Sequence, residues 1–457
     1  MTTTRVAAPL MLLALASAQP LGAQTSLTIY NDGRVLVRRS VAAAVPRGAS
    51  TQRVVLGPLD PASVFSLDSN VAITGLAYDG AVDEASVLRR SVGRRVVFRV
   101  PESHDTLSAL VLGVDPLRLQ LPDGRVTFSP PGLALYPGDV VVAEPAVSLR
   151  LESARALDRL RLGYFTRGAS WFASYQVLLG GTEARVTGSA VLESQTLRLE
   201  DAEVQLLAGA VGSAQQAAPP MPMQARAAMA DEARVEKSFA SEQRVGEFHV
   251  YSLPGRSSLL PGLTTTVALF EPAQVKYQRH YVVHGLLPFW GILPQQGDDS
   301  EAPVEVSYTL ERPRKREFGD RPLPGGIVRL FQADSAGRAQ LVGEAAMDHT
   351  PAGKDVRLTA GTAFDLTARR VQTSYATRRD STKAGWRTLA TADYRVTVRN
   401  ATDSAATVDV QEERGGEWSV LQSSVPAEKV SSTITRFRVK VPARGQTVLS
   451  YRVRVVW

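Results

Sequence analysis

The stretch ASWFASYQV, residues 169–177, decides the fold that we expect for this chain. It places three aromatic rings within five residues, directly after Gly168. On an extended strand, side chains alternate between two faces, so Trp171 and Tyr175 share one face and Phe172 lies on the other. A face that alternates large and small residues packs well inside a β-sandwich, where a tyrosine hydroxyl needs a hydrogen-bond partner. We therefore expect Trp171 to be buried and structural, and the three rings not to form one binding platform.

The same two-residue period continues on both sides of this stretch. The preceding LRLGYF, residues 160–165, also alternates, and the turn at 166–168 predicts a hairpin between the two runs. Asp-Gly turns separate further alternating runs at 31–33 and 122–124, which is a strong hairpin signal. The final strand places apolar residues on one face and polar residues on the other: Leu449, Tyr451, Val453, Val455 and Trp457 against Ser450, Arg452 and Arg454.

These patterns predict an all-β protein of several antiparallel β-sandwiches, the C-terminal one immunoglobulin-like, with a small inserted β-barrel. A length of 457 residues suffices for roughly three domains. Residues 212–240 are rich in alanine, proline and glutamine, cannot supply a core, and are expected to form a flexible linker. The expected division is a signal peptide at 1–23, an N-terminal β region at 24–211 with the barrel at about 91–147, the linker, a β-sandwich region at 241–385, and the immunoglobulin-like sandwich at 386–457.

The composition excludes several chemistries. The sequence contains no cysteine, which removes disulfides, thiolate metal ligands, cysteine nucleophiles and a lipid-modified cysteine anchor. The net charge of +7 is spread along the chain, without the basic stripe that nucleic-acid binding requires. We therefore expect no nucleic-acid partner, while weak attraction to anionic envelope polymers stays open.

The N-terminus has the pattern of a secretory signal. Arg5 precedes an apolar run at 6–16, and small residues follow, so cleavage is expected after Ala18 or Ala23. The apolar run is shorter than the about 20 residues that cross a bilayer as a helix, and no later stretch reaches that length. We expect an exported protein, periplasmic or extracellular, with no integral membrane span after signal removal.

Several stretches in this order resemble one bacterial family: YNDGRVLVRR (30–39), YFTRGASWFASY (164–175), LLAGAVG (206–212), YSLPGRSSLLPG (251–262), PLPGGIVRLFQ (322–332) and VGEAAMDHTPAGKDVRLTAGTAFDLTARR (342–370). Over essentially the whole mature chain, the sequence resembles the exported domain-of-unknown-function family DUF4139, related to mucoidy-inhibitor-A-like proteins. Longer members carry a coiled coil in the N-terminal half, where this chain has its small β insertion. The resemblance implies no established reaction, cofactor or catalytic residue.

Residues suited to catalysis or metal binding are few. His280 and His284 lie four apart in RHYVVH, a sequence that favours a strand, on which they would be about 13 Å apart and poorly placed for zinc. His349 is expected to stabilise a hydrogen-bonded turn at 350–353, with acid/base chemistry beside Asp348 as the alternative. The sequence lacks a GxSxG elbow, HExxH, a phosphate loop and GxGxxG. We assign no catalytic residue and expect no metal and no cofactor.

Two segments are candidate interaction surfaces. Residues 285–294, GLLPFWGILP, are apolar and interrupted by proline and glycine, so they are expected either to fill a gap between domains or to protrude toward a partner. The candidate contact residues of this loop are Leu286, Leu287, Phe289, Trp290 and Ile292. The segment ERPRKRE carries a candidate basic patch of Arg312, Arg314, Lys315 and Arg316, for which a solvated hairpin is the plainer interpretation.

Together these features favour a non-enzymatic exported β-sandwich protein that binds or scaffolds an unknown protein or polymer of the cell envelope. The first alternative is an envelope hydrolase with a site assembled from distant loops, since such a carboxylate pair leaves no sequence motif. The second is an outer-membrane β-barrel, which the final alternating strand imitates. Strands of unequal length and the linker argue against that barrel.

Overall fold

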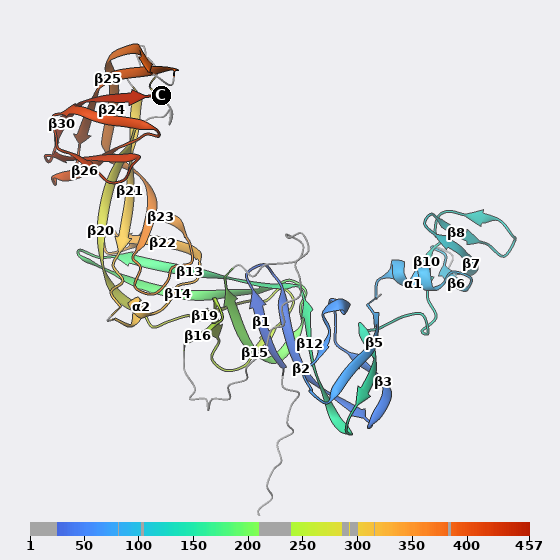
Figure 1. Cartoon of the computed structure of the whole chain (residues 1–457). Coiled ribbons are helices and arrows are strands. Elements are labelled where there is room, and N and C mark those ends of the chain that lie inside the picture. The colour runs from blue at the N-terminus through green and yellow to red at the C-terminus, as the bar shows by residue number, and fades with distance from the viewer. Residues whose placement is uncertain are drawn as a thin grey trace, which may run out of the picture.

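The computed structural model describes residues 25–80, 82–101, 105–209, 239–285, 292, 300–314, 316–382 and 385–457. In these residues, regular structure other than β is limited to helices α1 (Glu84–Arg90) and α2 (Glu317–Asp320) and one 3-10 turn (Pro61–Ser63). The prediction of an all-β protein with several, mainly antiparallel sheets is confirmed (Figure 1). No helix in the described part of the chain is both long and apolar enough to cross a membrane. The expected signal peptide lies outside the described residues, as does the linker up to residue 238.

We call the part of the chain that shares the largest hydrophobic core the central module. Of the four sheets in the described residues, two lie wholly within this module. An eight-stranded sheet has the order β16-β17-β15-β1-β2-β12-β4, with β18 beside β15. Its strands are β1 (Thr25–Tyr30), β2 (Val35–Val45), β4 (Phe65–Ser66), β12 (Leu157–Thr166), β15 (Leu199–Ala208), β16 (Ser241–Val245), β17 (Phe248–Ser252) and β18 (Ser257–Leu259). A three-stranded sheet consists of β3 (Gly48–Val55), β11 (Ala146–Ser153) and β5 (Val71–Asp79), with β11 in the middle.

The largest sheet has fourteen strands and continues into the C-terminal sandwich. Its first part contains β13 (Ala169–Leu179), β14 (Glu183–Ser194), β19 (Thr264–Ala268), β22 (Gly326–Ala333) and β23 (Ala339–Met347). Its long connecting strands are β20 (Ala273–His284), β21 (Ser300–Leu310) and β24 (Val356–Thr382). Its C-terminal part adds β25 (Gly385–Asn400), β26 (Ala406–Glu413), β27 (Glu417–Ser423), β28 (Ala427–Lys429), β29 (Ile434–Val441) and β30 (Gly445–Val456).

The strands on either side of Gly168 do not form the predicted hairpin. β12 pairs with β2 and β4 in the eight-stranded sheet, whereas β13 pairs with β14 and β22 in the fourteen-stranded sheet. The chain therefore turns a corner between two sheets at Gly168, whose φ of 102° is strongly disfavoured for residues with a side chain. The carbonyl oxygen of Gly168 accepts the backbone N–H groups of residues 195, 196 and 197, which fixes the corner. The predicted turns at 31–33 and 122–124 do connect hairpins, β1–β2 and β8–β9.

The inward face of β13 lies in the main hydrophobic core, as the alternation predicts. Trp171 is only 3% exposed, and Tyr175 is buried beside it. The hydroxyl of Tyr175 donates to the carbonyl oxygen of Pro324 at 2.8 Å, which supplies the partner that a buried tyrosine needs. Trp171 packs against Tyr251 of β17, whose hydroxyl donates to the carbonyl oxygen of Pro322 at 3.1 Å. Two buried tyrosines thus hold the segment that leads into β22.

The expected boundary between an N-terminal region and a second region is not a boundary of packing. β13 runs parallel to β22 from Ala173–Gly326 to Leu179–Gln332, and β15 pairs with β17. Residues from both sides of positions 212–240 therefore share one core. Gly326 permits the close approach of β22, because a Cβ there would lie 2.1 Å from the carbonyl oxygen of Ala173.

The C-terminal sandwich also extends beyond the expected range of 386–457. Its core includes Val283 of β20, Val304 of β21 and Leu366 of β24, together with β25, β26, β29 and β30. The opposite ends of β21 and β24 contribute Leu310 and Leu358 to the core of the central module. The same strands therefore belong to both cores and connect them, as Figure 1 shows along β20 and β21. Trp457 is half-exposed and does not continue the buried face of β30.

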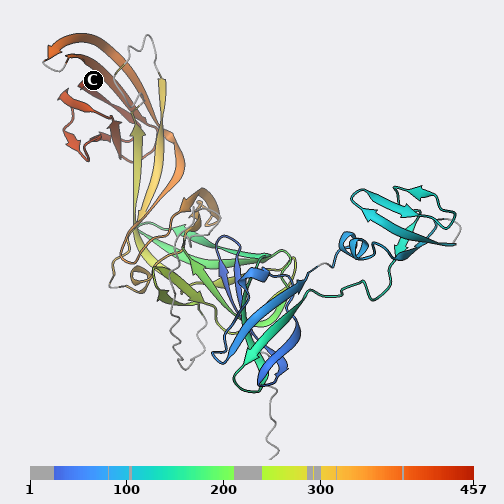
Figure 2. The same ribbon diagram turned by 45° about the vertical axis from the view of Figure 1, so that its right-hand side comes forward.

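The insertion forms an open sheet and not the predicted barrel. It has the order β10-β6-β7-β8-β9, with β10 (Leu133–Leu135), β6 (Arg95–Arg99), β7 (Thr106–Val114), β8 (Leu117–Gln120) and β9 (Val126–Thr127). The two edge strands contain only three and two residues, and in the described residues they do not pair with each other. Closure of a barrel requires a full ladder between its first and last strands. Figure 2 shows this small sheet standing apart from the central module on two connecting segments.

A buried ionic cluster joins the two layers of the C-terminal sandwich. The carboxylate of Glu412 accepts hydrogen bonds from Arg370 at 2.9 Å, from Arg414 at 3.2 Å and from the hydroxyl of Tyr451. All four side chains are almost fully buried, and Arg370 lies 3.8 Å from the ring centroid of Tyr394. Burial alone would lower the pKa of Arg370, but the attraction of Glu412 and neighbouring tyrosines raises it above its ordinary value. Arg370 therefore stays charged, and the guanidinium groups of both arginines have Glu412 as their carboxylate partner.

We predict that Glu412→Gln destabilises the C-terminal sandwich by about 3–5 kcal/mol, because it leaves two buried guanidinium groups without their carboxylate. Hydrogen–deuterium exchange of peptides from β26 and β30 measures this loss locally. Glu417→Gln is the matched control, since Glu417 is exposed and its ion pair with Arg387 at 3.7 Å contributes little. Equal protection in the two variants would contradict this assignment.

Candidate binding surfaces

The structure places only one of the candidate loop residues. Ile292 is 1% exposed and lies in the core of the C-terminal sandwich, where its carbonyl oxygen accepts the hydroxyl of Tyr375 at 3.0 Å. Residues 286–291, which include Leu286, Leu287, Phe289 and Trp290, lie outside the described residues. Ile292 therefore packs in the interior and is unavailable as a contact residue.

The candidate basic patch is not a set of four surface cations. Arg312 is 1% exposed, and its guanidinium lies 5.2 Å from the ring centroid of Phe318. The guanidinium donates to four backbone carbonyl oxygens, those of Phe318, Arg321, Pro351 and Lys354. Arg312 therefore fastens α2 to the 350–354 turn. Arg314 and Arg316 are exposed, and Lys315 lies outside the described residues.

The histidines singled out in the sequence have polar partners but do not converge. His280 and His284 lie on β20, where His280 contacts the hydroxyl of Thr309 at 3.1 Å and His284 lies 3.6 Å from Glu305. His349 Nδ1 accepts the N–H of Gly325 at 3.0 Å, which fits a structural role at the turn. Within the described parts of the chain, no group of three or more His, Asp or Glu side chains is arranged to hold a metal ion.

A shallow polar cavity of about 450 Å³ lies beside His280 and contains groups with acid/base chemistry. Its carboxylates already have partners: Asp355 accepts the backbone N–H of Arg312 at 2.8 Å, and Glu311 accepts the amide of Gln278 at 3.1 Å. Burial lowers the pKa of His280, and the nearby charge of Arg357 lowers it further. The cavity therefore places a neutral imidazole beside carboxylates that already have hydrogen-bond partners. This arrangement fits a structural role better than it fits proton transfer.

The small inserted sheet has one covered face. Its inner core consists of Val96, Phe98, Ala109, Val111 and Leu119. Leu88 of α1 and Tyr136 pack against this core, and the hydroxyl of Tyr136 donates to Glu84 at 3.1 Å. Burial raises the pKa of Tyr136, and the hydrogen bond to Glu84 raises it further, to about 12. Helix α1 and the segment after β10 therefore cover the inner face.

The opposite face of this sheet is uncovered, and apolar side chains occupy half of its positions. The strand register places three rows of side chains on it: Leu133, Arg99 and Thr106; Leu135, Val97 and Ser108; Arg95, Leu110, Gln120 and Val126. We call these ten positions the outer face. Leu133 is 70% exposed, and Phe128, directly after β9, is 65% exposed. Exposed apolar residues gathered on one face mark interaction sites in soluble proteins.

The charge on the outer face has a single sign. Arg95 and Arg99 are both exposed, and none of the ten positions carries a carboxylate. In the described part of the chain, neither arginine forms an ion pair. An apolar surface with two unpaired guanidinium groups is chemically suited to a partner that presents carboxylates beside apolar side chains.

Sequence reasoning missed this face, although its signal is present. The run RRVVFRV at 94–100 places Val96 and Phe98 on one face of a strand, and it adds Val97 between Arg95 and Arg99 on the other. The prediction of a barrel rested on the short strands and frequent turns, and it did not consider which residues of this run face outward.

Comparisons with known proteins add no family assignment. No protein-family model matches the chain, and a search of curated proteins finds no significant match.

We predict that Arg312→Met destabilises the central module by about 3–5 kcal/mol, because four backbone carbonyl oxygens lose the buried guanidinium that donates to them. Urea denaturation followed by circular dichroism measures the effect. Arg314→Met is the matched control, since Arg314 is exposed, and we expect a change within about 0.5 kcal/mol. Equal effects of the two substitutions would show that Arg312 is an ordinary surface cation.

We also predict that His280 titrates with a pKa below its ordinary value of about 6.5, because folding disfavours the charged imidazole. The stability from this neutral state is fully present above about pH 6.5 and decreases as the pH falls toward the folded-state pKa. An NMR titration identifies the resonance by its loss in His280→Gln. A midpoint at or above 6.5 would contradict the prediction.

Proposed function

We propose that this protein is a non-enzymatic binding protein of the cell envelope that holds an acidic, amphipathic segment of a partner protein against the outer face. The observation that carries the proposal is the outer face itself, which combines exposed leucine and valine side chains with two arginines that form no ion pair with any described residue. The envelope location is supported by the secretory pattern of the first residues.

Charge complementarity supports an acidic partner over a second copy of this chain. A face-to-face dimer through the outer face would bring together Arg95 and Arg99 of both copies, with no carboxylate at the ten positions to offset them. An acidic segment with apolar residues would cover the leucines and neutralise the arginines at once. These contacts need no reactive side chain on the outer face, which favours binding over catalysis.

The position of the small sheet supports a role in reaching a partner. Figures 1 and 2 show from two directions that the small sheet stands apart from the larger sheets on its two connecting segments. An ion pair between Arg94 and Asp139, 2.5 Å apart, and one between Arg90 and Asp79 lie near these connections. We infer that the central module and the C-terminal sandwich form a scaffold from which the small sheet is presented.

Site-specific photocrosslinking tests the proposal. Benzoylphenylalanine replaces Val97 in the whole mature chain, which is then irradiated in envelope extract of the parent organism. We expect one dominant crosslink to a peptide rich in aspartate or glutamate, and its loss in Arg95→Glu/Arg99→Glu and in Leu133→Ser/Leu135→Ser. These residues lie on one face, so both changes remove the same contact.

Two control variants distinguish specific docking on the outer face from nonspecific binding. Leu178→Ser and Arg185→Glu make the same chemical changes at exposed positions of the central module, and the crosslink must survive both. A crosslink to many unrelated proteins, a crosslink to a second copy of this chain, or one that persists in Arg95→Glu/Arg99→Glu would overturn the proposal.

A further inference from the structure

A cavity of about 510 Å³, open to solvent, lies at the corner around Gly168 and shares no residue with the outer face. The residues of its lining that bear on ligand binding are Arg34, Leu59, Asp60, Phe165, Arg167 and Thr196. A volume of this size falls in the range of small-molecule sites, which are mostly apolar with a few polar groups that fix orientation. Four separate chain segments meet here, at residues 34, 58–60, 165–168 and 196, because the chain passes between two sheets at this point.

The wall formed by Pro58, Leu59 and Asp60 is held firmly against the corner. The hydroxyl of Thr166 donates to the carbonyl oxygen of Pro58 at 2.6 Å, and the N–H of Asp60 donates to the carbonyl oxygen of Phe165 at 2.9 Å. The backbone N–H of Phe165 in turn donates to Ser63 at 2.8 Å. The wall is therefore positioned before any ligand arrives, which lowers the entropy that binding must overcome.

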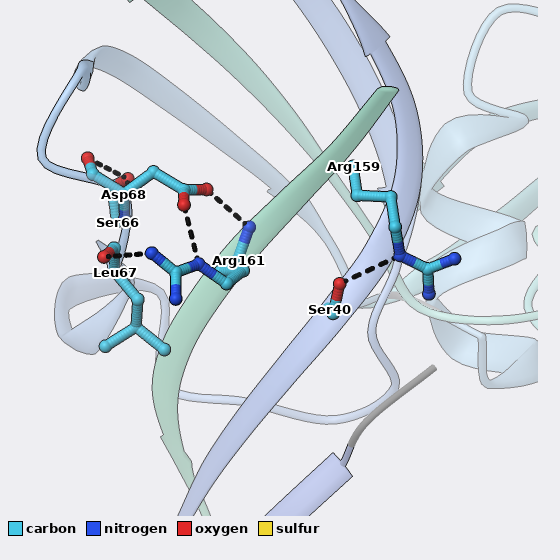
Figure 3. Close-up of polar contacts among 6 residues, drawn as sticks. All are labelled: Ser40, Ser66, Leu67, Asp68, Arg159 and Arg161. Atoms are coloured by element: carbon cyan, nitrogen blue, oxygen red, sulfur yellow. Dashed lines mark hydrogen bonds and ion pairs between the residues drawn. The ribbon is translucent and has the colours of Figure 1, made fainter. Parts of the chain in front are cut away.

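A second group of hydrogen bonds holds the other end of the segment 58–68 against β12. Arg161 of β12 donates through Nε to one oxygen of Asp68 at 2.6 Å and through its backbone N–H to the other at 2.8 Å. Its Nη2 also reaches the carbonyl oxygen of Leu67 at 3.3 Å. Figure 3 shows this contact and, two residues along β12, Arg159 bonded to Ser40 at 3.1 Å. Residues 58–68 are thus fixed at both ends.

The polar groups of the cavity favour an anion. Two arginines line it against one carboxylate, that of Asp60, which already accepts the N–H of Ala62 at 3.0 Å. Arg34 is held by Asp32 at 2.6 Å and lies over the ring of Tyr30. Arg167 is exposed and forms no ion pair with any described residue. Its guanidinium therefore offers a free anion-binding group beside the apolar surface of Leu59 and Phe165.

We propose that this corner cavity binds a small amphipathic carboxylate, with its apolar body against Leu59 and Phe165 and its carboxylate on Arg167. The hydroxyl of Thr196, also in the lining, is a further donor for the carboxylate. This site is independent of the outer face, since the two share no residue and lie on different sheets.

Ligand-observed NMR titration of the mature chain with phenylpropionate and with its neutral analogue phenylpropanol tests the site. The two probes have the same ring and chain length and differ in charge. We expect phenylpropionate to bind about tenfold more tightly than phenylpropanol, a ratio that corresponds to about 1.4 kcal/mol. Arg167→Gln should remove this preference, because the guanidinium is its source.

Arg159→Gln is the matched control, because it removes an exposed arginine from the neighbouring strand outside the cavity. It should leave the preference unchanged, and circular dichroism checks that both variants fold. Equal binding of the two probes, no binding of phenylpropionate, or a preference that survives in Arg167→Gln would overturn the proposal. Tighter binding of phenylalanine than of phenylpropionate would also overturn it, since Asp60 would then recognise an ammonium group.

Discussion

The parallel pairing of β13 with β22 is the contact on which the rest of the structure depends. It brings residues 173–179 against residues 326–332, so two distant parts of the chain complete one sheet. The hydroxyls of Tyr175 and Tyr251 fix the segment that enters β22, and Gly326 lets its backbone approach β13 closely. Parallel strands cannot be joined by a tight turn, so this pairing requires the long connection between Leu179 and Gly326.

The architecture follows from this pairing. Once β22 is placed beside β13, β20, β21 and β24 extend from the central core into the C-terminal sandwich and give the two cores common strands. The small sheet is inserted between β5 and β11, neighbours in the three-stranded sheet, so its ends begin and finish close together. The proposed docking face lies on the inserted sheet, and the proposed carboxylate site lies at the corner between β12 and β13. The two sites therefore depend on different parts of the fold.

Much of the local structure could be predicted from the sequence, because strand faces depend on a period of two. The burial of Trp171, the hydroxyl partner of Tyr175 and the Asp-Gly hairpins all follow from this rule and from turn chemistry. The alternation does not indicate which strand pairs with which, so the prediction of a hairpin across Gly168 is wrong. The basic run likewise gave no sign that Arg312 would find four carbonyl oxygens, three of them from more than eight residues away.

The most direct test of this account is to cut the chain between its two halves. A specific protease site is inserted within residues 212–238, and the cleaved mature protein is examined by size-exclusion chromatography under native conditions. Because β13–β22 and β15–β17 cross the cut and share one core, the fragments should elute together as a single species. Separation into two independently folded fragments would contradict the claim that both halves build one module.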